Sequence, residues 1–196
     1  MKALLAHSGV YSLFQRVIGA RKFRKTLAEK YASKKGARVL DIGCGTGEIL
    51  EYLPDADYTG FDINPDYVRR ASEKYSRARF ECRNILETNT LSHDWFDVAL
   101  AIGLLHHLSD EEALSLFKLC KSVLREGGRL VTYDGCFEEG QSPVARFLLK
   151  RDRGAHVRTR EAYLRLASQV FSSVRTDLSH DELRIPFTLL TMEMCK

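Results

Sequence analysis

Three glycines and two acids lie within one short stretch of the chain, VLDIGCGTGEIL at residues 39–50. The glycines occupy every second position, as Gly43, Gly45 and Gly47. Glycine lets a backbone turn tightly and approach a ligand closely, because it carries no Cβ. A dinucleotide-binding loop has the spacing G-x-G-x-x-G and holds a pyrophosphate on helix N–H groups. Here the last spacing is shorter, and Asp41 and Glu48 would repel a pyrophosphate but attract a ligand that carries an ammonium and a sulfonium.

Another acid, Asp62, ends the next strand-like run, YTGFDI. In an open α/β sheet, an acid at this strand tip can accept hydrogen bonds from both hydroxyls of a ribose. The glycine loop, its acids and Asp62 together indicate a site for a positively charged nucleoside. The alternative interpretation is a set of turn glycines and helix-capping acids.

Four candidates for proton transfer follow the fourth and fifth strand-like runs. His106 and His107 come directly after AIGLL, and Tyr133 and Asp134 end RLVTYD. A histidine here could act as a general base or orient the substrate. The alternative for the histidine pair is packing against the start of the next helix. For Tyr133 and Asp134 the alternative is hydrogen bonding to loop backbone.

Positively charged side chains interrupt the segment KRDRGAHVRTREAY at residues 150–163. Arg153, His156 and Arg158 are spaced irregularly, so they do not form one helical stripe. Arginine can hold a carboxylate or a phosphate with two parallel hydrogen bonds. The alternative is a solvated loop that leads into a helix. Arginine does not complement the positive N-terminal end of a helix, which favours binding of an anionic substrate.

The elements that must position these residues alternate between strand and helix. Strands are predicted at residues 37–43, 58–63, 78–84, 95–103 and 127–135, and helices at 64–77, 109–128 and 159–170. Asn64, Ser109 or Asp110, and Thr159 are the expected N-caps. This order predicts a largely parallel sheet. Residues 171–180 and 182–195 are predicted to form a hairpin that adds an antiparallel strand to the sheet.

Composition narrows the class of protein. A chain of 196 residues with 44% hydrophobic side chains fits one domain, and no apolar run approaches the roughly 20 residues of a membrane span. The first residues lack a clear signal-peptide pattern, so we expect them in the mature protein. The five cysteines form no C-x-x-C pair, which predicts free thiols, no metal site and a cytoplasmic location. The net charge of +4 includes two basic clusters, interpreted either as solvated helix faces or as attraction for an anionic substrate.

On these motifs the chain resembles the class I S-adenosylmethionine-dependent methyltransferases over nearly its whole length. VLDIGCGTG is similar to their first motif, GFDIN to the second, ECRNIL to the third, and FDVALAIGLLHHLSD to the fourth. The LLHHL segment is similar to small, single-domain members of the ubiquinone and menaquinone biosynthesis type. The resemblance implies an α/β, Rossmann-like, doubly wound sheet of seven strands, mostly parallel with an antiparallel C-terminal strand. It also implies one domain over residues 1–196, with a helical lid at 1–35 and a substrate-side insertion at 135–160.

The resemblance further implies S-adenosyl-L-methionine as the cofactor and S-adenosyl-L-homocysteine as the product. Asp41 would then support the methionine ammonium, Asp62 the ribose hydroxyls, and Ile63 the adenine face. Asn84 stands where the family often has Asp, but its carbonyl can still accept a bond from the adenine amine. The cofactor residues implied in full are Asp41, Gly43, Cys44, Gly45, Gly47, Asp62, Ile63, Asn84, Ile85, Ala101, Ile102 and Gly103, with Tyr11 from the lid.

The function expected is methyl transfer to an O or N atom of a small, preferably anionic, metabolite by a monomer or homodimer. One alternative is a tRNA or rRNA methyltransferase drawn to the basic segments. Against it, no separate RNA-binding module is recognisable, and AIGLLHHL stands where many base-methylating enzymes have Asn-Pro-Pro-Tyr. The other alternative is a non-catalytic protein that binds S-adenosylmethionine.

Overall fold

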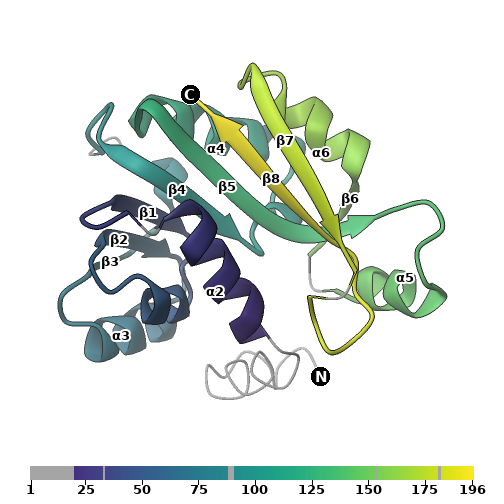
Figure 1. Cartoon of the computed structure of the whole chain (residues 1–196), viewed down its shortest axis with the longest axis horizontal. Coiled ribbons are helices and arrows are strands. Elements are labelled where there is room, and N and C mark those ends of the chain that lie inside the picture. The colour runs from purple at the N-terminus through teal and green to yellow at the C-terminus, as the bar shows by residue number, and fades with distance from the viewer. Residues whose placement is uncertain (1–19, 33, 88–90, 153, 181) are drawn as a thin grey trace.

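A computed structural model describes residues 20–32, 34–87, 91–152, 154–180 and 182–196. Seven strands form one twisted sheet in the spatial order β3-β2-β1-β4-β5-β8-β7 (Figure 1). Their bounds are β1 Arg38–Ile42, β2 Asp57–Asp62, β3 Arg79–Cys82, β4 Phe96–Ile102, β5 Leu124–Phe137, β7 Ser173–Ser179 and β8 Leu189–Cys195. β8 pairs antiparallel with both neighbours, and the other pairs are parallel. A two-residue strand, β6 (Arg158–Thr159), pairs with the end of β5. The predicted doubly wound sheet is confirmed.

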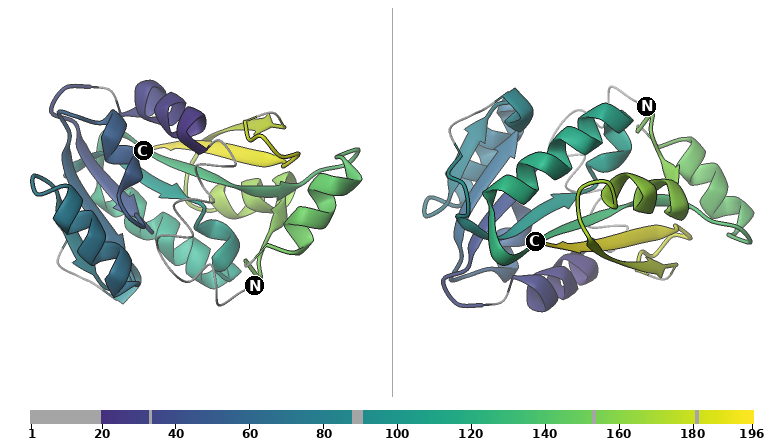
Figure 2. Two further views of the ribbon diagram at one scale, coloured as in Figure 1. Left: turned by 90° about the horizontal axis from the view of Figure 1, so that it is seen from below. Right: turned by 90° about the horizontal axis from the view of Figure 1, so that it is seen from above.

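Helices cover both faces of this sheet. Their bounds are α2 Ala20–Tyr31, α3 Pro65–Lys74, α4 Asp110–Val123, α5 Pro143–Lys150 and α6 Arg160–Ala167, with 3-10 helices η2 Glu48–Tyr52, η3 Ile85–Glu87 and η4 Leu105–His107. α2 lies on one face, and α4 and α6 lie on the other (Figure 2). Asn64, Ser109 and Thr159 cap α3, α4 and α6 as predicted, through side-chain oxygens that accept backbone N–H bonds.

The core consists of two buried clusters, one on each face of the central strands. Leu40 and Ala99 belong to the cluster under α4 and α6, whereas Val39 and Val98 belong to the cluster under α2. Successive side chains of a strand point to opposite faces, so both sets of positions must be apolar. The parallel strands end at one edge of the sheet. Between β1 and β4 the spatial order of the strands reverses relative to their order in the chain.

The first helical element after the glycine loop is the short 3-10 helix η2, which begins after left-handed Gly47 and ends before Pro54. Two strand boundaries differ from the predicted ones. β5 begins at Leu124, ahead of the glycine pair, because backbone hydrogen bonds join Gly127 and Gly128 to the C-terminal Lys196. β8 begins only at Leu189, so residues 183–187 form an irregular connection.

Candidate functional site

The glycine loop wraps around the tip of β2. Gly43, Gly45 and Gly47 have φ angles of 71°, 56° and 69°, a region that side chains with a Cβ rarely enter. The N–H groups of Gly43 and Cys44 both donate to the Phe61 carbonyl, at 2.8 and 3.0 Å. A Cβ built on Gly45 would meet no atom within 4 Å. The loop therefore presents bare backbone to open space at Gly45.

The carboxylate of Asp62 is held in place from two sides. Its Oδ2 accepts the Gly45 N–H and its Oδ1 accepts the Asn64 N–H, both at 2.8 Å. Each carboxylate oxygen can accept a further bond. The next residue, Ile63, exposes 74% of its surface. A fixed carboxylate beside an exposed apolar side chain fits a ribose and the ring attached to it.

Asp41 is buried at the base of the loop. It is 3% exposed, and its Oδ2 accepts the Tyr58 hydroxyl at 2.6 Å. Burial raises the pKa of Asp41 to about 7, and the charge of Asp62 acts in the same direction, although the Tyr58 bond and Arg24 oppose it. Burial also raises the pKa of the Cys44 thiol, so this thiol is neutral.

A hollow lies above the glycine loop, where α2 faces it. Its lining residues are Arg24, Asp41, Gly43, Cys44, Gly45, Thr46, Glu48, Ile49 and Ile102. Arg24 of α2 forms an ion pair with Glu48 at 2.6 Å, and both side chains are largely shielded from solvent. Acidic and basic groups thus lie together in the hollow, which fits a methionine part that carries both an ammonium and a carboxylate. In the sequence Arg24 is one residue of a basic cluster, and nothing local indicates its partner 24 residues away.

The remaining residues expected at the cofactor fall into three groups. Ile102 lines the hollow, and Gly103 turns the chain with a φ of 68° while its N–H donates to the Tyr133 carbonyl. The side chains of Ala101 and Ile85 are buried in the core at 0% and 4% exposure, which leaves only their backbone for a ligand. Tyr11 lies outside the described residues.

Asn84 has a local role at the start of η3. Its Oδ1 accepts the Leu86 N–H at 3.1 Å, and its Nδ2 donates to Glu87 Oε1 at 3.0 Å. The amide oxygen retains a second lone pair. The amide therefore caps the 3-10 helix, and any contact with adenine would have to share that oxygen.

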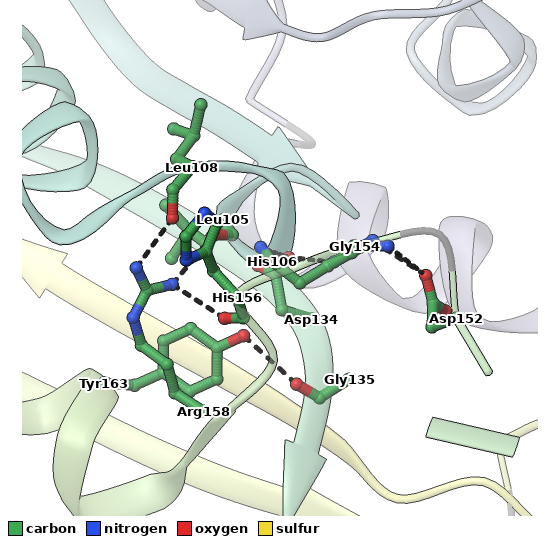
Figure 3. Close-up of polar contacts among 10 residues, drawn as sticks. All are labelled: Leu105, His106, Leu108, Asp134, Gly135, Asp152, Gly154, His156, Arg158 and Tyr163. Atoms are coloured by element: carbon green, nitrogen blue, oxygen red, sulfur yellow. Dashed lines mark hydrogen bonds and ion pairs between the residues drawn. The ribbon is translucent and has the colours of Figure 1, made fainter. Parts of the chain in front are cut away.

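His106, which follows β4, and Asp134, near the carboxyl end of β5, form a buried pair (Figure 3). The His106 Nδ1 lies 2.8 Å from Asp134 Oδ1, and this oxygen also accepts the His106 backbone N–H at 3.3 Å. Asp134 is 2% exposed, and its Oδ2 has no hydrogen-bond partner among the described residues. A carboxylate beside Nδ1 favours a proton on that nitrogen, which leaves Nε2 as the ring atom that can exchange a proton. That Nε2 lies 3.5 Å from Asp152 Oδ1.

His107 and Tyr133 lie close to this pair in different surroundings. The His107 ring is 4.2 Å from that of His106, centroid to centroid, and its side chain is exposed. Tyr133 is 6% exposed and stacks on Phe23 of α2 with ring centroids 4.5 Å apart. Burial and the charge of Glu182 raise the pKa of Tyr133, so its hydroxyl is a neutral group.

The segment after α5 folds over His106. The His156 N–H donates to the His106 carbonyl at 2.9 Å, and a Cβ on Gly154 would come within 2.2 Å of His106 Cδ2. These bonds use only the backbone of His156, so its side chain stays a predicted substrate contact. Arg153 lies outside the described residues.

Arg158 has a structural role in addition to its predicted one. Its guanidinium donates to the carbonyls of Leu105, His156 and Leu108 (Figure 3). It also pairs with Asp110. The residue is 9% exposed, so these partners occupy the head group. These partners hold the arginine at the carboxyl end of η4, so it would have to give up some of them to bind an anionic substrate as predicted.

Two other sequence expectations concern metals and membranes. The described residues contain no group of three or more His, Cys, Asp or Glu side chains placed to hold a metal ion. Within the same residues, no helix has the length and apolar character needed to cross a membrane.

Comparison with known proteins adds sequence relatives to this geometry. A family model described as "Methyltransferase domain" matches residues 39–128. An uncharacterized methyltransferase of Anoxybacillus flavithermus is 28% identical over 66% of this chain and 62% of its own. A ubiquinone biosynthesis O-methyltransferase of Coxiella burnetii is 30% identical over 52% of this chain and 45% of its own. The chain thus spans less than two thirds of the length of these relatives.

Solved structures share the fold over nearly the whole chain. A TehB-like S-adenosylmethionine-dependent methyltransferase from Corynebacterium glutamicum superposes with a TM-score of 0.69 at 20% identity, covering 97% of this chain and 99% of the other. A second such enzyme, from Archaeoglobus fulgidus, gives a TM-score of 0.73 at 19% identity, covering 95% and 99%. At these identities the likeness concerns the architecture alone.

Proposed function

We propose that the chain is a class I S-adenosylmethionine-dependent methyltransferase that transfers a methyl group to an oxygen or nitrogen atom of a small molecule, a proposal that the matched methyltransferase family model and relatives support. The observation that carries the proposal is the Asp62 carboxylate, which the Gly45 and Asn64 N–H groups fix beside exposed Ile63. Such a carboxylate has lone pairs left for two ribose hydroxyls.

The methionine part of the cofactor would lie in the hollow above the glycine loop. When bound, S-adenosylmethionine supplies a methyl group already activated by its sulfonium. Asp41 and Glu48 would attract the ammonium, and Arg24 would bind the carboxylate. The closely packed glycine backbone would hold the cofactor in one orientation and exclude water from one side.

His106 would receive the proton that the acceptor loses. Asp134 orients the imidazole and stabilises its charged form, an arrangement that makes Nε2 a general base. Asp152, 3.5 Å from Nε2, would then separate from the imidazole or share the proton with it. A buried carboxylate oxygen without a partner costs about 1–3 kcal/mol, which indicates that Asp134 serves a purpose other than stability.

The proposal of a small-molecule acceptor is supported by the named relatives and by the distribution of charge. The Coxiella relative is named an O-methyltransferase, and a Zea mays relative, 28% identical over 81% of this chain, is named phosphoethanolamine N-methyltransferase 1. Several arginines that could otherwise bind RNA phosphates form ion pairs with acidic side chains. The pairs are Arg24–Glu48, Arg38–Asp97, Arg125–Asp97, Arg129–Glu193 and Arg158–Asp110.

The proposed function is tested by incubating the purified chain with methyl-labelled S-adenosylmethionine and a fractionated small-metabolite extract. The expected result is label in a small product, identified by mass, which is lost in the Asp62→Ala variant. Label that enters only RNA, or no label above the Asp62→Ala background in either fraction, would contradict the proposal.

A further inference from the structure

A second cavity lies between α5 and the connection from β7 to β8, two segments that run near each other in Figure 1. Its volume is ≈ 360 Å³, within the range of about 300–1,000 Å³ that is usual for small-molecule sites. It shares no lining residue with the hollow at the glycine loop. Its lining residues are Ser142, Ala145, His180, Leu183, Arg184, Ile185, Pro186, Phe187 and Thr188. The cavity is therefore a separate site, large enough for a small organic molecule.

The walls combine apolar surface with two groups that can carry positive charge. Leu183, Ile185 and Phe187 supply most of the apolar side chains, and Arg184 and His180 supply the cationic or polar ones. His180 Nδ1 lies 3.4 Å from Thr188 Oγ1. Arg184 is exposed and has no ion pair or hydrogen bond among the described residues, unlike the arginines paired with acids. An arginine without an acid at a cavity wall can bind a carboxylate or phosphate with two hydrogen bonds.

The cavity adjoins β5 near its carboxyl end. A Cβ on Gly135 would lie 3.3 Å from the Phe187 ring. The Cys136 N–H donates to the Thr188 carbonyl at 3.0 Å, which ties the cavity wall to the same strand. Successive strand residues point to opposite faces, so the cavity lies on the face under α2, whereas Asp134 points to the face under α4 and α6.

From this geometry we infer that the cavity is a second binding site, and that its ligand is a small aromatic acid. The ring would pack on Phe187, Leu183 and Ile185, and the carboxylate or phosphate would bind Arg184 with His180 beside it. The inference goes beyond the proposed function and does not depend on it, because the cavity and the hollow at the glycine loop share no lining residue. The binding can be measured without any methyl transfer.

The test uses 4-hydroxybenzoate and its uncharged counterpart 4-hydroxybenzamide as probes of the full chain, with binding measured by calorimetry. We expect the carboxylate probe to bind at least tenfold tighter than the amide. Arg184→Gln should remove this preference and leave amide binding within about twofold, since one charged hydrogen-bonded pair is lost. Arg165→Gln, which removes an exposed arginine that does not line the cavity, is the matched control and should keep the preference.

Equal affinities of the two probes, no binding of either, or an unchanged preference in Arg184→Gln would overturn the inference. Binding of S-adenosylmethionine, measured on the same samples, separates this inference from the proposed function. A wild type that prefers the benzoate but does not bind S-adenosylmethionine would support the anion site and contradict the methyltransferase. The melting temperature of Arg184→Gln should match the wild type, because the exposed side chain makes no contact that folding requires.

Discussion

At the scale of single residues, His106 and His107 are neighbours in sequence with different surroundings. His106 is bonded to buried Asp134, whereas His107 is exposed. His106→Ala should lower kcat about 100-fold, the lower end of the range for a general base, with the Kd for S-adenosylmethionine within threefold of wild type. His107→Ala should keep kcat within threefold. Steady-state kinetics with calorimetry check this, and equal losses in the two variants would contradict the assignment of the base to His106.

A second prediction at this scale concerns Asp134, whose replacement by Asn should lower activity and leave stability almost unchanged. The Asp134→Asn side chain keeps an oxygen for both bonds to His106 but loses the charge that stabilises a protonated imidazole. We expect the free energy of unfolding to change by less than about 1 kcal/mol, because the lost carboxylate already holds one unpartnered oxygen. We expect kcat to fall at least tenfold. A large loss of stability with kcat unchanged would show that the pair is structural.

Asp41 predicts a particular dependence of stability on pH. Its pKa rises from 3.8 to about 7 on folding, so between these values the folded protein retains a proton that the unfolded chain releases. The contribution of Asp41 to stability is therefore largest below pH 3.8 and is lost as the pH rises to about 7. Urea unfolding of wild type and Asp41→Asn should show a difference that shrinks by up to about 4 kcal/mol over this window and is flat above it. A constant difference between the two proteins would show that burial does not raise this pKa.

At the scale of elements, Arg158 joins the start of α6 to η4 and the start of α4. Its partners are the carbonyls of Leu105 and Leu108 and the carboxylate of Asp110. Arg158→Lys keeps the charge but cannot reproduce this fork of bonds, so we expect a loss of about 2–4 kcal/mol in the free energy of unfolding. Arg165→Lys, on the exposed face of α6, is the control and should change stability by less than about 0.5 kcal/mol. A stable Arg158→Lys protein with a raised KM for its acceptor would support the substrate-binding interpretation.

The elements themselves show what the sequence could and could not predict. Asn64, Ser109 and Thr159 were predictable as caps because the N–H groups that they accept lie within three residues. The glycine loop was predictable for the same reason, since its strained φ angles require glycine locally. The role of Arg158 was not, because its partners at η4 and α4 lie 48 to 53 residues away and two of them are backbone carbonyls. The same holds for the pairing of Arg24 with Glu48 and for the cavity beside Arg184, which only tertiary packing creates.

At the scale of the whole molecule, the sheet brings every proposed role to one edge. The glycine loop follows β1, Asp62 ends β2, His106 follows β4 and Asp134 lies near the end of β5. Residues from four strands thus meet, because the carboxyl ends of parallel strands lie at the same edge of the sheet. Motifs that are far apart in the sequence can therefore form one site. The cavity at Arg184 lies beside the same strand end, through Gly135 and Thr188.

The distribution of charge over the molecule predicts weak binding to RNA. The net charge of +4 is small, and among the described residues several arginines are paired to acids, which lowers the positive charge left for phosphates. Fluorescence anisotropy with labelled tRNA at physiological salt should give a Kd no tighter than about 10⁻⁴ M. A submicromolar Kd that weakens steeply with salt would instead support the RNA methyltransferase.

The central claim is that the edge formed by β1 and β2 binds S-adenosylmethionine, and calorimetric titration tests it most directly. The account predicts one site per chain with a micromolar Kd in the wild type. Asp62→Asn, which keeps one oxygen to accept a backbone bond but loses the charge, should bind at least tenfold more weakly, a difference of about 1.4 kcal/mol or more. Absence of binding to the folded wild type, or equal affinity in Asp62→Asn, would contradict the account.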